Sequence, residues 1–333
     1  MYLFDESKAG FVERNFNVDL FFILRVTTVA GILVGLALGG IDIYLNRIAK
    51  KKHSFRFYIL IRSLFYLITF SVILSVIITR ASFFYFDRAL DITLSKEGSQ
   101  LVHSIIFAFI LYSIVIGILV SFIAEVSKKF GPGVLLRMFL GKYYNPIVEE
   151  RIFMFVDLKS STTYAEKLGH IKYSQLIQDC FNDLNISASK HKAEIYQYVG
   201  DEAVITWQLE KGLKNSNYLK FYFDFQERIT QRAGYYKSEY DMIPEFKAGV
   251  NGGKITAAEV GDIKREIAYH GDVINTAARI QGVCNSYGKK LLVSEFLAEK
   301  INTDNNYNNE EIGSITLKGK EIPVSIYSIG QQV

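Results

Sequence analysis

The sequence has few cysteines and no cluster of metal-binding side chains built from cysteine and histidine. Only two cysteines, Cys180 and Cys284, and five histidines occur among its 333 residues, and they do not show the spacing of a zinc site. The chain also lacks a basic stripe interleaved with stacking aromatic residues, which argues against nucleic-acid binding. Its formal net charge of +4 is explained by basic loops in the first half.

Charged residues are missing from three stretches of that half. Residues 101–124 contain no Asp, Glu, Lys or Arg over 24 positions, and residues 63–79 contain none over 17. A third stretch, residues 26–41, is also uncharged. About 20 apolar residues cross a bilayer core, so we predict a membrane region over residues 1–125 with about three transmembrane helices. These helices cover about residues 20–45, 55–79 and 101–124. No small-residue cleavage site precedes a soluble region, so a signal peptide is disfavoured.

The loops between these helices predict their orientation. The loop after the first helix carries only basic charge, whereas residues 80–100 balance three basic residues against three acidic ones. The basic residues are Arg47, Lys50, Lys51, Lys52 and Arg56. Because basic loops stay inside, we expect a multi-pass protein of the inner membrane whose third helix returns the chain to the cytoplasm. The sequence leaves open whether a further helix precedes residue 1 and what the membrane region senses.

The first predicted helix carries a glycine at every fourth position. Gly31, Gly35 and Gly39 would form a flat seam on which another helix packs closely. The alternative is that glycine is simply common in membrane helices. Residues 126–150 are predicted to link this region to a second domain over residues 151–330.

Two aspartates in that second domain stand at the ends of β-prone runs. Asp157 closes the apolar run that begins at Phe153, and Asp201 follows Val199 and Gly200. Such positions project carboxylates from strand edges or turns. Mg²⁺ prefers a few carboxylates together with substrate phosphates, although an aspartate at a strand end is more often a turn residue. The pair therefore predicts a site for a metal-bound nucleotide triphosphate.

Two later motifs add polar and basic groups. Asn275 and Arg279 are four residues apart in a segment that reads as a turn entering a helix, so they share one helix face. An amide beside a guanidinium suits a sugar oxygen next to a phosphate with growing charge, although a solvated helix face is the simpler reading. The alternating run from Ser314 to Tyr327 predicts a hairpin with Lys318 and Lys320 at its tip.

In this order, the four motifs resemble the catalytic domain of the class III adenylyl and guanylyl cyclases, from about Arg151 to Ile329. The resemblance implies that the two aspartates bind two Mg²⁺ or Mn²⁺ ions per active site, with the Leu158 carbonyl as a further ligand. It implies that Asn275 orients the ribose, that Arg279 stabilises the transition state, and that Lys318 contacts the terminal phosphates, with Lys320 as the alternative. It also implies that the triphosphate is bound by the backbone amides of Ser160, Ser161 and Thr162.

The residues that would contact the purine depart from the family pattern. Gln197 stands where adenylyl cyclases usually have Lys and guanylyl cyclases Glu, and Ala268 stands where Asp, Thr or Cys is frequent. A glutamine amide can present either hydrogen-bond pattern, so chemistry alone does not choose between adenine and guanine. The stretch from Lys264 to Asp272 is similar to bacterial membrane cyclases that are usually assigned to ATP, which favours ATP.

The resemblance implies an α+β catalytic domain, an antiparallel-rich sheet with helices on one side, preceded by the helical transmembrane region. It implies a membrane-anchored homodimeric adenylate cyclase in signal transduction, because each family active site takes residues from two domains. The expected reaction is intramolecular phosphoryl transfer from ATP to 3′,5′-cyclic AMP and pyrophosphate. Alternatives are a guanylate cyclase, or a nucleotide-binding receptor with a catalytically silent cyclase-like domain. A diguanylate cyclase is disfavoured, because only Gly200-Asp201-Glu202 of its signature is present.

Overall fold

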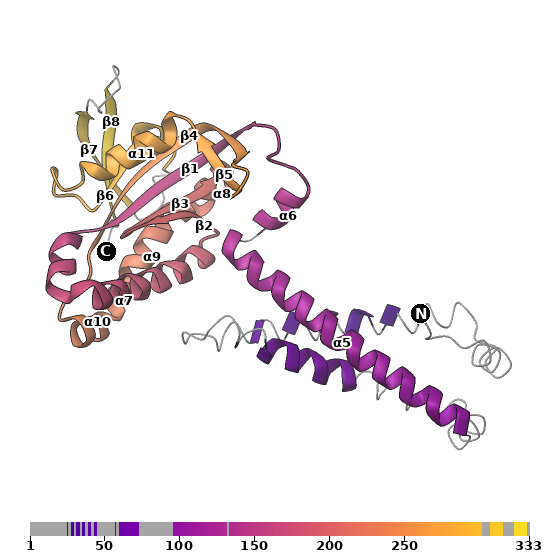
Figure 1. The fold of residues 1–333 in the computed structure, drawn as a ribbon. Helices are drawn as coiled ribbons and strands as arrows, with labels where there is room; N and C mark the ends of the chain where they lie inside the picture. The colour runs from indigo at the N-terminus through magenta and orange to yellow at the C-terminus, as the bar shows by residue number, and fades with distance from the viewer. Residues whose placement is uncertain are drawn as a thin grey trace. The chain divides into compact units, whose positions relative to one another are not determined.

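The structure is a computed structural model in which the chain divides into two compact units, Met1–Phe130 and Gly131–Val333 (Figure 1). The described residues are 25, 28–29, 31–33, 35–36, 39–40, 43–44, 57, 60–72, 96–131, 133–301, 307–315 and 323–331. The predicted basic loop, the loop that follows the second predicted helix up to residue 95, and the hairpin tip with Lys318 and Lys320 lie outside these residues.

The described part of the second unit is built on an eight-stranded sheet, which agrees with the antiparallel-rich sheet that the resemblance implies (Figure 1). The strand order is β2-β3-β1-β4-β6-β8-β7, and β5 pairs with β4. All pairs are antiparallel except β4 with β6. The strands are β1 (Ile147–Leu158), β2 (Glu194–Val199), β3 (Glu202–Gln208), β4 (Phe246–Val260), β5 (Glu266–His270), β6 (Leu291–Ser294), β7 (Tyr307–Ile315) and β8 (Val324–Gln331).

Helices cover both faces of this sheet, so the prediction of helices on one side is wrong. Alternate residues of β1 point to opposite faces: Met154 and Val156 belong to the core under α7 and α9, whereas Phe153 and Phe155 belong to a second buried cluster against α11. Two apolar faces need two covers. The helices are α6 (Val134–Phe139), α7 (Ser161–Lys190), α8 (Leu209–Leu213), α9 (Asn217–Gln231), α10 (Ala233–Tyr240), α11 (Asp272–Gly282) and α12 (Glu295–Ala298), with a 3₁₀ turn at Lys214–Ser216.

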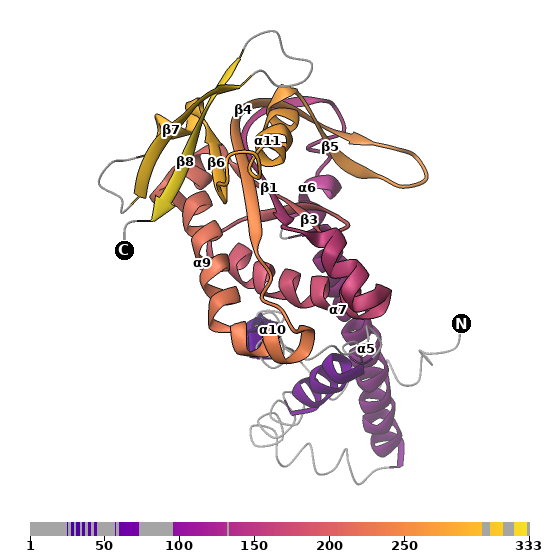
Figure 2. The ribbon, with the colours of Figure 1, turned by 90° about the vertical axis from the view of Figure 1, so that its left-hand side faces the viewer.

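Strand β4 runs without a break through Gly252 and Gly253. It continues to Val260, and the chain then turns back into β5 (Figure 2). A Cβ at Gly252 would come within 2.9 Å of the Leu297 side chain. The glycine therefore serves close packing against α12 rather than a turn.

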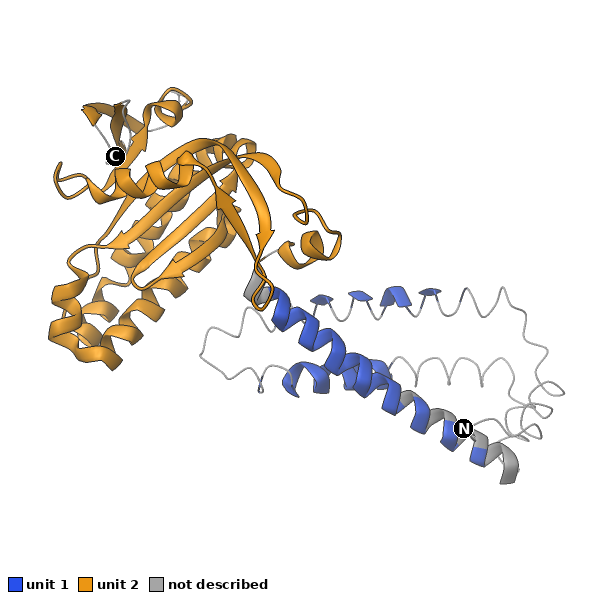
Figure 3. Cartoon of the chain, turned by 45° about the horizontal axis from the view of Figure 1, so that its top comes forward, with its two compact units in different colours: residues 1–130 blue, residues 131–333 orange. Residues whose placement is uncertain are grey.

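The first unit contains the long helix α5 (Lys96–Phe130) and a shorter apolar helix, Leu60–Val72 (Figure 3). Within the described residues, one helix is long and apolar enough to cross a membrane, through Ile110–Ser127 of α5. Small residues let the two helices approach closely, because a Cβ at Gly117 would lie only 3.5 Å from Cβ of Tyr66. Arg62 and Glu125 form a buried ion pair of 3.4 Å between them.

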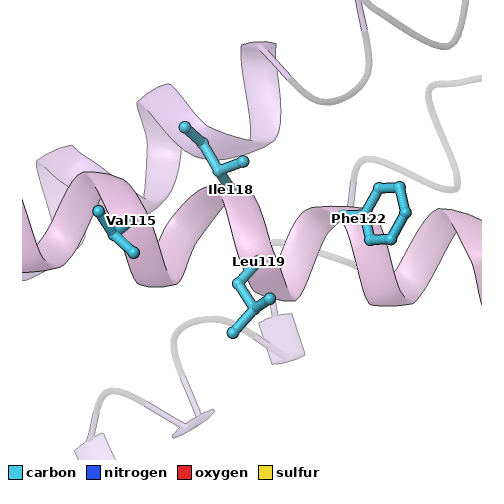
Figure 4. A pocket seen from close by; sticks show the side chains of 4 residues that line it. All are labelled: Val115, Ile118, Leu119 and Phe122. Carbon is cyan, nitrogen blue, oxygen red and sulfur yellow. The ribbon is translucent and has the colours of Figure 1, made fainter.

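Another face of α5 is apolar. Val115, Ile118, Leu119 and Phe122 are each about half exposed and line a groove of about 390 Å³ (Figure 4). In the predicted glycine seam, a Cβ at Gly31, Gly35 or Gly39 would meet nothing within 4 Å among the described residues. The close helix contact predicted there is therefore not formed within the described part of the chain.

Candidate active site

Asp157 stands at the end of β1, between one acidic and one basic neighbour. The strand register places Glu202 of β3 directly opposite on one side and Lys247 of β4 on the other. Residues opposite each other in antiparallel strands share a sheet face, and here it is the face covered by α11. The β-prone run before Asp157 thus forms the predicted strand and delivers its carboxylate to that face.

Two groups hold one oxygen of the Asp157 carboxylate. Nε2 of Gln281 donates a hydrogen bond to Oδ2 at 2.9 Å, and Nζ of Lys247 lies 3.2 Å from the same oxygen. Among the described residues, none forms a hydrogen bond or ion pair with Oδ1. One carboxylate oxygen is therefore fixed from α11 and β4, and the other is available to a ligand.

Asp201 lies in the turn between β2 and β3, after Gly200 with its positive φ of 62°. Burial raises the pKa of the Asp157 carboxyl, and the Asp201 charge adds to the rise, while Lys247 and Gln281 oppose it. Burial together with the charges of Asp157 and Asp201 raises the pKa of Glu202 to about 7. Burial is the largest cause of both shifts, and the further rise from neighbouring charges indicates that the fold brings the two predicted carboxylates near each other.

This donor set fits a hard divalent cation. No group of three or more His, Cys, Asp or Glu side chains close enough to hold an ion occurs among the described residues, so the protein alone offers two aspartates and backbone oxygen. Mg²⁺ is commonly bound in this way, with substrate phosphates and water completing its coordination. The charge of Asp201 adds to the raised pKa of Asp157, and such an ion would relieve this repulsion.

The N-terminus of α7 follows directly after β1. Ser160 has a left-handed backbone, φ 58°, and no side chain caps the helix that begins at Ser161. The first amides of a helix have no partner within it and suit an anion. The helix bends at Gly169, and burial raises the pKa of the Tyr173 phenol beyond this bend, with the Asp201 charge adding to the rise. Tyr173, beyond the bend, therefore lies near the carboxylates.

Asn275 and Arg279 lie on α11, which forms where the sequence predicts it. Asn275 is exposed and Arg279 is partly exposed, whereas Ala277 and Gln281 are buried against the sheet. Neither Asn275 nor Arg279 forms a hydrogen bond or ion pair with any described residue. The helix thus points one face toward the Asp157 carboxylate and presents the predicted amide and guanidinium on another.

The strands that carry Gln197 and Ala268 contact each other through the residues next to these two, Tyr196 and Tyr269. A bulge in β2 lies between Ile195 and Gln197, and the Tyr196 and Tyr269 rings stand 4.9 Å apart, both against Phe153. Gln197 is exposed and Ala268 is partly buried.

Lys247, Gln281 and Glu202 also lie at this site, and none of them belongs to the four sequence motifs. Gln281 follows the buried Ala277 by four residues, so it shares the inward face of α11, and this spacing is the one signal that could have found it. Lys247 and Glu202 lie at the site only because their strands pair with β1 in this register. The residues around them in the sequence do not indicate that pairing.

Several known proteins are similar to this chain. The family model described as "Adenylate and Guanylate cyclase catalytic domain" matches residues 144–331. Adenylate cyclase 2 of Rhizobium meliloti (strain 1021) is 31% identical over 210 residues, which cover 63% of this chain and 58% of that protein. An adenylate cyclase of Anabaena cylindrica is 21% identical over 187 residues, 53% of this chain and 36% of the relative. The chain thus spans less than two thirds of the length of these relatives.

Two solved structures share the fold. The adenylyl cyclase CyaB from P. aeruginosa superposes with a TM-score of 0.51 at 17% identity, covering 57% of this chain and 97% of that structure. A bacterial light-regulated adenylyl cyclase superposes with a TM-score of 0.57 at 16% identity, covering 66% of this chain and 65% of the other. At these identities the likeness concerns the fold alone.

Proposed function

We propose that this chain, which belongs to the family of adenylate and guanylate cyclase catalytic domains, is an adenylate cyclase that converts ATP to 3′,5′-cyclic AMP and pyrophosphate. The observation that carries the proposal is the pair Asp157 and Asp201, brought together beside the uncapped N-terminus of α7, with Oδ1 of Asp157 available. The name of the Rhizobium meliloti relative, adenylate cyclase 2, supports the choice of reaction.

The proposed metal site consists of the Asp157 and Asp201 carboxylates and the Leu158 carbonyl. Two Mg²⁺ or Mn²⁺ ions bound there would supply activation of the ribose 3′-oxygen and charge neutralisation at the triphosphate. Lys247 holds Oδ2 of Asp157 and adds positive charge to the site. The amides at Ser160, Ser161 and Thr162 bind phosphate oxygens, as free amides at a helix N-terminus do, and Lys318 is assigned to the terminal phosphates.

The reaction is an internal displacement at phosphorus. The ribose 3′-oxygen forms a bond to the α-phosphorus, the bond from that phosphorus to the bridging oxygen breaks, and pyrophosphate leaves. Asn275 orients the ribose, and the Arg279 guanidinium stabilises the negative charge that develops on the phosphate. The 3′-hydroxyl proton passes to water or a substrate phosphate, because no side-chain base is assigned.

The active site is proposed to form between two copies of the chain. One copy supplies the metal aspartates, and the other supplies the purine contacts together with Asn275 and Arg279. In support, Asn275 and Arg279 form no hydrogen bond or ion pair with the described residues of their own chain. A different face of α11 points to Asp157. A chain that carries both sets of residues forms two equivalent sites in a twofold homodimer.

The purine site is proposed to accept ATP with loose discrimination against GTP. The Gln197 amide can rotate to serve either base, and Ala268 offers no side-chain hydrogen bond. The exposure of Gln197 on the edge strand β2 is compatible with this rotation. A guanylate cyclase is the alternative that the same residues allow.

The catalytic unit is proposed to be anchored in the inner membrane by a multi-pass helical region and to lie in the cytoplasm, where nucleotide and Mg²⁺ are available. Support comes from α5, whose segment Ile110–Ser127 is long and apolar enough to span a bilayer. The close packing of α5 on the helix Leu60–Val72 adds a second apolar element to this region.

The experiment that tests the function is turnover of radiolabelled ATP and GTP by the detergent-solubilised full chain. Labelled cyclic AMP as the main product supports the proposal. Predominant cyclic GMP would support the guanylate cyclase, a cyclic dinucleotide would indicate a diguanylate cyclase, and tight nucleotide binding without product would indicate a silent receptor.

A further inference from the structure

Gln281 is the one residue of α11 that bonds to a proposed metal carboxylate among the described residues. Its side chain is buried, and its Nε2 donates to Oδ2 of Asp157 at 2.9 Å across 124 positions of sequence. An amide N–H to a carboxylate is a charge-assisted hydrogen bond, which is stronger and more directional than a neutral one. Together with Lys247 on the same oxygen, it fixes the rotation of the carboxylate.

The position of Gln281 is set by a close approach between backbones. A Cβ on Gly249 of β4 would lie 2.1 Å from the backbone N of Gln281 and 2.6 Å from the carbonyl O of Ala277. Only glycine permits this approach. Nearer the start of the helix, Nδ2 of Asn251 donates to the Val273 carbonyl at 3.1 Å. Two contacts from β4 therefore hold α11 at both ends.

The helix consequently takes part in both active sites of the proposed dimer. Its inward face reaches Asp157 through Gln281, and another face presents Asn275 and Arg279. Residues that orient a metal ligand from outside the coordination sphere typically change metal affinity 10- to 100-fold when removed. A displacement of α11 would change the orientation of the Asp157 carboxylate and would also move the Arg279 guanidinium.

We propose that Gln281 is a positioning residue, which holds Oδ2 of Asp157 so that Oδ1 faces the metal ion and ties that carboxylate to the helix bearing Asn275 and Arg279. The inference rests on the proposed function, because it concerns the divalent metal of that site. It assigns a role to a side chain outside the Asp, Asn and Arg motifs.

The test replaces Gln281 by Met, which keeps the volume and removes the donor. Gln226→Met is the matched control, because Nε2 of Gln226 donates to the Phe246 carbonyl at 3.2 Å, next to Lys247, without touching a carboxylate. Mn²⁺ binding to the full chain in detergent is measured by calorimetry with a non-cyclising ATP analogue present. The Mn²⁺ dependence of turnover and the KM for ATP at saturating Mn²⁺ are measured in parallel.

Gln281→Met is expected to raise the Mn²⁺ half-saturation about 10-fold or more, with excess Mn²⁺ restoring most of kcat and the KM for ATP changing little. Gln226→Met is expected to keep the wild-type half-saturation. An unchanged half-saturation in Gln281→Met, equal shifts in both variants, or no measurable Mn²⁺ binding to the wild type would overturn the inference. If no cyclic nucleotide forms but the calorimetric shift remains, the proposed function fails and the positioning role stands.

Discussion

Nζ of Lys247 lies 3.2 Å from Oδ2 of Asp157, across the neighbouring strands β4 and β1. The strand register brings the two side chains to the same face of the sheet, because the two residues stand directly opposite each other. A basic side chain thus lies beside Asp157 and Glu202, whose pKa values are raised by burial and further by the charge of Asp201. Lys247 thus already balances part of the negative charge of the carboxylates before a metal-bound triphosphate binds.

Lys247→Met is therefore expected to lower kcat/KM for ATP about 10- to 100-fold. Losses of this size are typical when a residue that orients a metal ligand from outside the coordination sphere is removed. Lys247→Arg, which keeps the charge, should retain most activity. Lys190→Met is a suitable control, because Lys190 pairs with Asp224 at the far end of α7. Steady-state kinetics at saturating Mg²⁺ would decide, and wild-type kinetics in Lys247→Met would show that the ion pair has no functional role.

The pKa of Glu202 predicts how stability depends on pH without divalent ions. The folded pKa is raised from 4.5 to about 7, so the folded protein keeps a proton that the unfolded chain releases in this window. The stabilising contribution is present below pH 4.5 and is lost as the pH rises through about 7. Burial of Asp157 acts in the same direction.

Thermal unfolding of the full chain in detergent with chelator should therefore show a Tm that falls between these pH values. Glu202→Gln should flatten the profile and raise the Tm at pH values above the window, whereas the exposed Glu239→Gln on α10 should not. A Glu202→Gln profile identical to that of the wild type would contradict the grouping of the three carboxylates.

The sequence predicts the elements of this fold better than their arrangement. Runs of β-prone residues place Asp157 on a strand and Asp201 in a turn, because strand periodicity and Gly200 are local signals. Lys247 and Glu202 join the site only through pairing between distant strands. Helix α11 covers the second sheet face because Gly249 leaves room for its backbone, and a single glycine in a strand does not reveal that contact beforehand.

The shared active site predicts complementation between inactive chains. Asp157→Ala removes one half of each site and Arg279→Ala removes the other, so a mixed dimer keeps one intact site. Co-expression should restore about a quarter of wild-type activity if the chains mix at random in a twofold dimer. Two inactive variants that stay inactive after verified co-assembly would contradict a site formed between chains.

The unusual purine residues predict weak base discrimination. A rotatable amide loses little with the wrong base, whereas fixed polar partners leave buried groups unpaired. We expect ATP to be preferred over GTP by a modest factor, and Gln197→Lys with Ala268→Asp to sharpen the preference. A competition assay with ATP and GTP at equal concentrations measures this preference. A strong preference for GTP would overturn the choice of ATP, and a preference for ATP above about a thousandfold, roughly 4 kcal/mol, would require other residues that contact the base.

The most direct test is conversion of labelled ATP to cyclic AMP by the wild-type full chain in detergent, compared with Asp157→Ala and Asp201→Ala. The wild type should be active, with Mn²⁺ supporting at least as much turnover as Mg²⁺. Each variant should remain folded and lose activity by several orders of magnitude, because the bridging of the metal ions is lost. Turnover near the wild-type rate in either variant would contradict the assignment of the two aspartates to the metal site.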